Sequence, residues 1–119
     1  MIYGIGTDLI EVERIKKAYA KESFRKKVYT EAEQTLIAEN AQRAAGNFAV
    51  KESVVKAFGT GFGKISAIDI EVLREPSGKP YVVLHGPAKE LAEEEHILHI
   101  HVSISNVKEM AVGYVVMEV

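Results

Sequence analysis

Two acidic residues and one lysine are the strongest candidates for chemistry in this sequence. Asp8 lies where a predicted strand meets a predicted helix, and Glu52 lies in a long apolar helical stretch with Lys56 four residues later. Residues at i and i+4 share one face of a helix, so Glu52 and Lys56 are neighbours. Because Mg²⁺ usually binds one or two carboxylates together with phosphate oxygens and water, the three side chains could hold Mg²⁺ and a phosphate.

Asp8 also has a purely structural interpretation. It precedes Glu11 by three residues, which is the spacing of a capping box, and so predicts a helix that starts near Leu9. An N-cap of this kind is worth ~1 kcal/mol. A carboxylate oxygen that binds a metal is less available to the backbone, so the two roles are compatible only in part.

Glu52 and Lys56 could equally form an exposed ion pair worth ~0.3–0.5 kcal/mol. The surrounding segment argues against this, because residues 48–58 are otherwise nearly all apolar. We therefore expect Lys51, Glu52 and Lys56 to emerge from a mostly buried helix.

Two further motifs are less specific. The glycine-rich run at 59–63 follows a helix, whereas phosphate-binding loops normally precede one, so it predicts a helix stop. Alternating polar residues in the predicted strand 98–105 have no carboxylate at triad-like spacing, which disfavours a serine hydrolase or a zinc site. These polar residues are His99, His101, Ser103 and Ser105.

Size and composition favour a small globular protein. The chain has 119 residues, of which 47% are apolar and 27% charged, so we expect a single domain over 1–119 whose site is shallow or shared between subunits. The sequence has no cysteine, no apolar run long enough to span a bilayer and no signal-peptide pattern at its start. We therefore expect a soluble, cytoplasmic protein that does not bind membranes.

Charge is unevenly distributed along the chain. The net charge is −2, which gives no indication of nucleic-acid binding, but residues 14–27 are strongly basic and residues 89–95 acidic. Such asymmetry can steer an acidic partner to one face, or it can simply mark two solvated helix surfaces.

The predicted elements give an α+β fold with helices in the N-terminal half packed on a mainly antiparallel sheet. Helices are predicted from near Leu9, from the Thr30–Glu33 capping box to about Asn40, over 48–58 and over 87–95. Gly46 marks a weak break before the third of these, and the helical pattern from Gln42 either stops there or runs through it. Strands are predicted over 2–10, 65–73, 81–84, 98–105 and 110–119.

Four segments in this order resemble the holo-acyl-carrier-protein synthases, the small bacterial members of the 4′-phosphopantetheinyl transferase superfamily. They are GIGTDLIEVER at 4–14, FAVKESVVKA at 48–57, GTG at 59–61 and HVSIS at 101–105. The pair Thr30 and Glu33 and the run Gly78-Lys79-Pro80 fit the same pattern. The resemblance covers nearly the whole chain and implies the phosphopantetheinyl transferase fold.

This resemblance implies transfer of 4′-phosphopantetheine from coenzyme A to a serine of apo acyl carrier protein in fatty-acid biosynthesis, with release of adenosine 3′,5′-bisphosphate. Asp8 and Glu52 would bind Mg²⁺, and Lys56 would stabilise or protonate the leaving phosphate. Either Glu52 or a metal-bound water would take the serine proton.

The resemblance also implies the binding surfaces. Residues expected to bind coenzyme A are Lys56, Gly59, Thr60, Gly61, Lys64, Pro80, Ser103 and Asn106. Residues expected to contact the carrier protein, which in this family is an acidic helical bundle, are Arg14, Lys21, Phe24 and Arg25. Relatives of this size are homotrimers with coenzyme A between neighbouring subunits, which agrees with the shared site expected from chain length.

The sequence departs from the family pattern at two positions. Many relatives have arginine where this chain has Asn47 and histidine where it has Asn106, and both family residues are associated with coenzyme phosphates. Lys64 or Lys51 could replace the lost charge. The departures leave two alternatives open: a catalytically weak paralogue that only binds a carrier protein, and a different Mg²⁺-dependent nucleotide enzyme.

Overall fold

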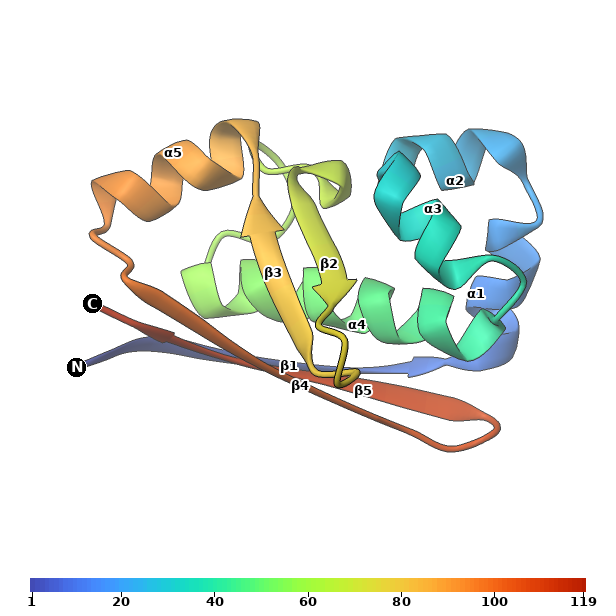
Figure 1. The fold of residues 1–119 in the computed structure, drawn as a ribbon. Helices are drawn as coiled ribbons and strands as arrows, with labels where there is room; N and C mark the ends of the chain where they lie inside the picture. The colour runs from blue at the N-terminus through green and yellow to red at the C-terminus, as the bar shows by residue number, and fades with distance from the viewer.

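The computed structural model describes residues 1–119 as an α+β fold built on two antiparallel sheets (Figure 1). The larger sheet has the order β1-β5-β4 and the smaller pairs β2 with β3. The strands are β1 (Ile2–Glu11), β2 (Ile70–Arg74), β3 (Pro80–Leu84), β4 (His99–Asn106) and β5 (Met110–Glu118). The helices are α1 (Val12–Tyr19), α2 (Glu22–Val28), α3 (Glu31–Ile37), α4 (Ala41–Phe58) and α5 (Gly86–Glu94), with a short 3₁₀ turn at Ala67–Asp69.

Helix α4 is the centre of the fold. It lies along one face of the larger sheet, and the other helices and the β2–β3 hairpin lie on the same side (Figure 1). Its interior residues are buried in two core clusters, one toward β2, β5 and α5 and the other toward α1, α2 and α3. Gly46 does not interrupt it, and Gly59 ends it in the left-handed conformation with φ 77°. The predicted helix end at Gly59 is confirmed, and of the two possibilities left open for Gly46 the continuous helix is the one observed.

The opposite face of the larger sheet is left uncovered by the chain. Gly4, Gly6 and Asp8 face α4, so the alternate residues of β1 face away from it. Among the outward residues of the sheet, Ile5, Leu9 and Tyr114 are 58%, 66% and 47% exposed. The fold therefore leaves large apolar side chains on this surface.

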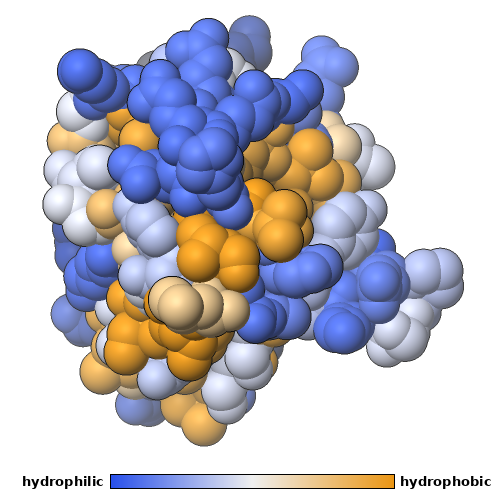
Figure 2. Space-filling view, turned by 90° about the vertical axis from the view of Figure 1, so that its left-hand side faces the viewer, coloured by the Kyte–Doolittle hydropathy of each residue, from blue (hydrophilic) through white to orange (hydrophobic).

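The two chain ends lie together at one end of the sheet. The Val119 amide donates to the Met1 carbonyl at 2.9 Å. Met1, Ile2 and Leu98 are exposed at this end, and Figure 2 shows a patch of apolar surface there, bordered by polar atoms. This end of the molecule is also not covered by the chain's own elements.

The expectation that a helix starts near Leu9 is wrong. Strand β1 continues to Glu11, and Asp8, Leu9 and Ile10 pair with residues 111–113 of β5. The first helical amide, that of Val12, donates to the Glu109 carbonyl at 2.9 Å, and no side chain caps α1. Strand pairing across the chain thus replaces the local cap, and Asp8 is not an N-cap.

Other boundaries differ by less. The strand expected from residue 65 begins only at Ile70, because Ala67–Asp69 forms a 3₁₀ turn with its own capping box at Ser66. Helix α3 ends at Ile37 rather than near Asn40, and α2 was not predicted as a separate helix. The Thr30–Glu33 capping box, the β4–β5 hairpin and α5 are confirmed. No helix is both long and apolar enough to cross a membrane.

Candidate functional site

The structure brings Asp8, Glu52 and Lys56 together at the edge formed by β1 and α4. The Lys56 ammonium donates to Asp8 Oδ1 at 3.2 Å and to the Thr7 carbonyl at 2.9 Å. The Asp8 side chain is only 18% exposed, whereas that of Lys56 is 51% exposed. Glu52 is half-buried one turn before Lys56. The three residues therefore form one polar cluster that solvent reaches from the lysine side.

The charges in this cluster shift the pKa of Glu52. Partial burial and the nearby Asp8 carboxylate raise the pKa of Glu52, while Lys56 and Arg14 act in the opposite direction. Arg14, on the first turns of α1, therefore also belongs to the electrostatic surroundings of the cluster. Two carboxylates close enough to repel form a site that favours a cation.

Glycine at two positions allows β1 to approach α4 this closely. A Cβ on Gly6 would lie 1.9 Å from the Ser53 carbonyl oxygen, and one on Gly4 would lie 2.2 Å from that of Ala57. Residues two apart on a strand share a face, so Asp8 points to the same side as Gly6. The glycines thus place Asp8 next to the helical turn that carries Glu52 and Lys56.

The chemistry of these donors fits Mg²⁺. Asp8 and Glu52 supply carboxylate oxygens, and no group of three or more histidine, cysteine, aspartate or glutamate residues is arranged to hold a metal. Mg²⁺ is commonly bound by one or two carboxylates, with water and substrate phosphates completing its coordination.

A cleft of about 430 Å³ adjoins Glu52. One wall is formed by α2, including Phe24, and the other by the segment 62–67, including Phe62, with Phe48 of α4 between them. Phe24 and Phe48 pack with ring centroids 6.1 Å apart. The sequence analysis did not single out Phe48 or Phe62 as site residues. The signal available for Phe62 is an aromatic residue inside a glycine-rich run.

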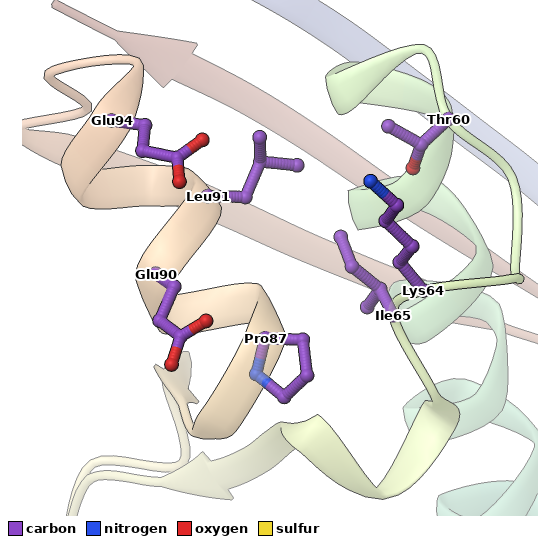
Figure 3. A pocket seen from close by; sticks show the side chains of 7 residues that line it. All are labelled: Thr60, Lys64, Ile65, Pro87, Glu90, Leu91 and Glu94. Carbon is purple, nitrogen blue, oxygen red and sulfur yellow. The ribbon is translucent and has the colours of Figure 1, made fainter.

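A second cleft of about 530 Å³ lies between the loop after α4 and helix α5. Thr60 and Lys64 line it from the loop side, and the carboxylates of Glu90 and Glu94 face them from α5 (Figure 3). Gly61, like Gly59, has a positive φ, which turns the chain sharply around Thr60. The loop residues expected to bind coenzyme A are thus gathered here, beside the C-terminal end of α4.

Three other expected coenzyme residues lie elsewhere. Ser103 pairs with Tyr114, which pairs with Thr7, so Ser103 lies on the sheet face opposite to that of Asp8. Asn106 ends β4, the edge strand farther from Asp8, and Pro80 begins β3 in the other sheet. Within one chain these residues do not join the Asp8 cluster.

The four residues expected to contact a carrier protein differ in their surroundings. Lys21 is exposed just before α2, and Phe24 is half-buried in the cleft beside Glu52. The Arg25 guanidinium donates to the Tyr19 carbonyl at 2.7 Å and lies 5.7 Å from the centre of that ring. Arg14 and Lys21 are thus more exposed than the other two.

Lys51 does not emerge from α4, contrary to expectation. It is completely buried, with its ammonium 2.8 Å from Glu33 Oε1, and so cannot replace a missing charge at the coenzyme phosphates. Asn47 is also completely buried, and its amide donates to Glu33 and to the Val72 carbonyl. Positions 47 and 51 are one turn apart and face α3 and β2, whereas Glu52 faces the neighbouring cleft.

The sequence and fold are similar to those of known proteins along almost the full chain. A family model described as the 4′-phosphopantetheinyl transferase superfamily matches residues 4–115. A holo-[acyl-carrier-protein] synthase from Lachnoclostridium phytofermentans is 54% identical over 119 residues, covering 100% of this chain and 98% of that protein.

Solved structures show the same similarity. The holo-[acyl-carrier-protein] synthase from Neisseria meningitidis matches with a TM-score of 0.90 at 30% identity, covering 100% of both chains. The synthase from Helicobacter pylori, in complex with coenzyme A, matches with a TM-score of 0.87 at 30% identity, covering 96% of this chain and 99% of that one.

Proposed function

The chain belongs to the holo-acyl-carrier-protein synthases of the 4′-phosphopantetheinyl transferase superfamily, and from this premise we propose that Asp8, Glu52 and Lys56 form its active site. The reaction transfers 4′-phosphopantetheine from coenzyme A to apo acyl carrier protein. The observation that carries the assignment is the convergence of these three side chains beside a cleft, from segments 44 residues apart or more in the sequence (8 against 52 and 56).

Asp8 and Glu52 are the proposed Mg²⁺ ligands. The metal would neutralise negative charge on the coenzyme pyrophosphate during transfer. The carrier serine oxygen forms a new bond to the β-phosphorus while the bond to the leaving phosphate breaks, and adenosine 3′,5′-bisphosphate departs.

The neighbouring side chains have distinct proposed roles. Lys56 is held over β1 by the Thr7 carbonyl and Asp8, yet remains about half exposed, so its ammonium can donate to the leaving phosphate. Glu52 is also a candidate to accept the serine proton, because its carboxylate borders the cleft in the same cluster as Asp8 and Lys56. Loop residues Thr60 and Lys64 are the proposed coenzyme contacts from the same chain.

The assignment is tested by incubating the protein with apo carrier protein, coenzyme A and Mg²⁺ and measuring the carrier mass. We expect Asp8→Asn and Glu52→Gln each to lower kcat/KM at least ~100-fold, the usual effect of removing a group that stabilises developing charge. Glu95→Gln removes an exposed carboxylate at the end of α5 and should leave the rate unchanged. Transfer at wild-type rates by both site variants would disprove the proposed site.

Carrier docking is proposed along the basic segment at α1 and α2. Lys21→Glu should raise the KM for the carrier while leaving the KM for coenzyme A unchanged, because Lys21 is exposed and does not line the cleft that contains Thr60 and Lys64. Lys89→Glu on α5 makes the same charge change as a control. Equal effects on both substrates would contradict docking at this surface. Carrier binding without any transfer by the wild-type protein would instead support a binding paralogue.

A homotrimer is part of the proposal. Pro80, Ser103 and Asn106 lie away from Asp8 in one chain, and Ile5, Leu9 and Tyr114 leave apolar surface on the open face of the sheet. A neighbouring subunit would cover this surface and supply the missing wall of the coenzyme site. Cytoplasmic location is the remaining part of the proposal.

A further inference from the structure

A buried ion pair stands directly beside the cleft but takes no part in the proposed chemistry. The Lys51 and Glu33 side chains are both 0% exposed. The Lys51 ammonium donates to Glu33 Oε1 at 2.8 Å, to the Ala67 carbonyl at 2.9 Å and to the Ile70 carbonyl. An ammonium has three protons, so Lys51 has no donor left for a substrate.

Each acceptor belongs to a different part of the cleft structure. Ala67 is the last residue of the 62–67 wall, and Ile70 begins the strand that follows it. Glu33 belongs to α3, whose capping box with Thr30 follows Val28 of the α2 wall by only two residues. The Lys51 ammonium also lies 5.4 Å from the centre of the Tyr29 ring. Tyr29 belongs to the short link between α2 and α3.

Lys51 itself is the residue before Glu52 on α4. One cation therefore connects three segments: the helix that carries Glu52, the 62–67 wall and the α2–α3 wall. The α2–α3 side has other hydrogen bonds with α4, from Asn47 to Glu33 at 3.0 Å and from the Tyr29 hydroxyl to the Ala44 carbonyl at 2.8 Å. Lys51 differs from these because it also bonds to Ala67 in the 62–67 wall.

Stability alone does not require an ion pair here. Burying two charges is costly, and apolar replacements of similar volume are often neutral or even stabilising. An apolar side chain at position 51, however, could not donate hydrogen bonds to the Ala67 and Ile70 carbonyls or pair with the Glu33 carboxylate. What the ion pair adds is a fixed distance between the walls and α4.

We propose that Lys51 is a positioning residue for the transfer reaction, holding both walls of the Glu52 cleft in the spacing that the carrier protein needs. This inference rests on the proposed function, because Phe24 in the α2 wall is a proposed carrier contact. Glu33 is its partner on the α3 side. The metal ligands are held independently, through the close packing of β1 on α4.

The test is the double variant Lys51→Met with Glu33→Gln. Methionine keeps the unbranched chain, and glutamine can keep the capping box with Thr30, so no charge is left buried alone. We expect the KM for the carrier to rise at least ~10-fold while the KM for coenzyme A and the Mg²⁺ dependence change less than ~2-fold, a difference of at least ~1.4 kcal/mol in carrier recognition. Amide hydrogen exchange should accelerate in 62–70 and α2 but not in α4 or β1.

Two further variants complete the test. Val115→Ala truncates a completely buried residue of β5, which belongs to neither wall of the cleft, so it should lower Tm without changing either KM. Glu33→Asp keeps a carboxylate as the counter-charge but shortens its side chain by one methylene, and it keeps the Lys51 contacts with Ala67 and Ile70, so it should accelerate exchange in α2 and α3 but not in 62–70. This single variant decides the matter if the double variant does not fold.

The inference is overturned if the double variant, or Glu33→Asp in its place, shows wild-type exchange in the walls and a wild-type KM for the carrier. A loss of kcat in proportion to the folded fraction, with both KM values unchanged, would also overturn it. Failure of the wild-type protein to transfer phosphopantetheine would contradict the proposed function instead. The exchange measurements would still test whether the Lys51–Glu33 ion pair holds the two cleft walls to α4.

Discussion

Glu52 is held beside Asp8 at a cost in stability. Partial burial and the Asp8 charge raise the pKa of Glu52, and Lys56 and Arg14 offset this only in part. Between the ordinary glutamate pKa of ~4.3 and the raised value, the folded protein binds more protons than the unfolded chain. Its stability therefore falls as pH rises through this window, and the loss persists at neutral pH.

The variant Glu52→Gln should consequently be more thermostable than wild type at pH 7 without Mg²⁺. We expect a rise in Tm of about 1–3 °C, because interactions of partly exposed charges are worth well under ~1 kcal/mol. The difference should vanish below pH ~4, where Glu52 is protonated in both states. Calorimetry from pH ~3 to ~8 measures the difference in Tm, and a lower Tm for the variant at pH 7 would refute the repulsion.

At the scale of elements, the position of Asp8 depends on how β1 packs on α4. The strand is placed by backbone contact rather than by side-chain packing, since a Cβ at Gly6 would overlap the Ser53 carbonyl. Gly113 of β5 has the same relation to Ala49, with the nearest backbone atoms 2.7 Å from an added Cβ. Two adjacent strands thus press directly on the helix, and Asp8, Glu52 and Lys56 are held in place by that contact.

Gly6→Ala should therefore reduce stability and activity together. Overpacking of this kind costs typically ~1–3 kcal/mol, and displacement of β1 would also carry Asp8 away from Lys56. Gly63→Ala adds a methyl group with nothing within 4 Å and should leave Tm unchanged. The measurements are urea unfolding and transfer rate under conditions where both variants are folded. A Gly6→Ala protein with wild-type stability would show that the strand can move freely.

At the scale of the whole molecule, the open face of the larger sheet exposes large apolar side chains to solvent. Ile5, Leu9 and Tyr114 lie on it, on the side away from every helix (Figure 1). A monomer would leave these side chains in water and would lack Pro80, Ser103 and Asn106 near its Asp8 cluster. In the proposed trimer, a neighbouring subunit would cover these side chains and would supply the coenzyme residues.

The double variant Leu9→Lys with Tyr114→Lys should therefore be a folded monomer with at least ~10-fold lower kcat/KM for coenzyme A. Like charges introduced into a packed interface are strongly disfavoured, whereas both positions are open in the single chain. Glu31→Lys, on exposed α3, is the control for added positive charge. Sedimentation velocity and transfer assays test this; a fully active monomer would disprove the shared site.

Local patterns in the sequence determine where several helices and strands of this protein begin and end. Thr30 and Glu33 define the start of α3, Gly59 ends α4, and period-two alternation marks β4, because each signal acts within one turn or one strand. The motifs around Asp8, Glu52 and Lys56 also indicate the family, the fold and the reaction from the sequence alone.

Contacts between distant segments decided the rest. Asp8 has the spacing of a helix cap, but pairing of β1 with β5, about a hundred residues away, keeps it in a strand (Asp8 with Gly113). From the sequence, Lys51 is expected to be exposed beside Glu52. In the structure its ammonium is buried, because it donates hydrogen bonds to Glu33 and to two backbone carbonyls outside α4, those of Ala67 and Ile70. Local spacing cannot specify such outcomes, because strand pairing and the burial of a charge depend on partners that only the folded chain brings near.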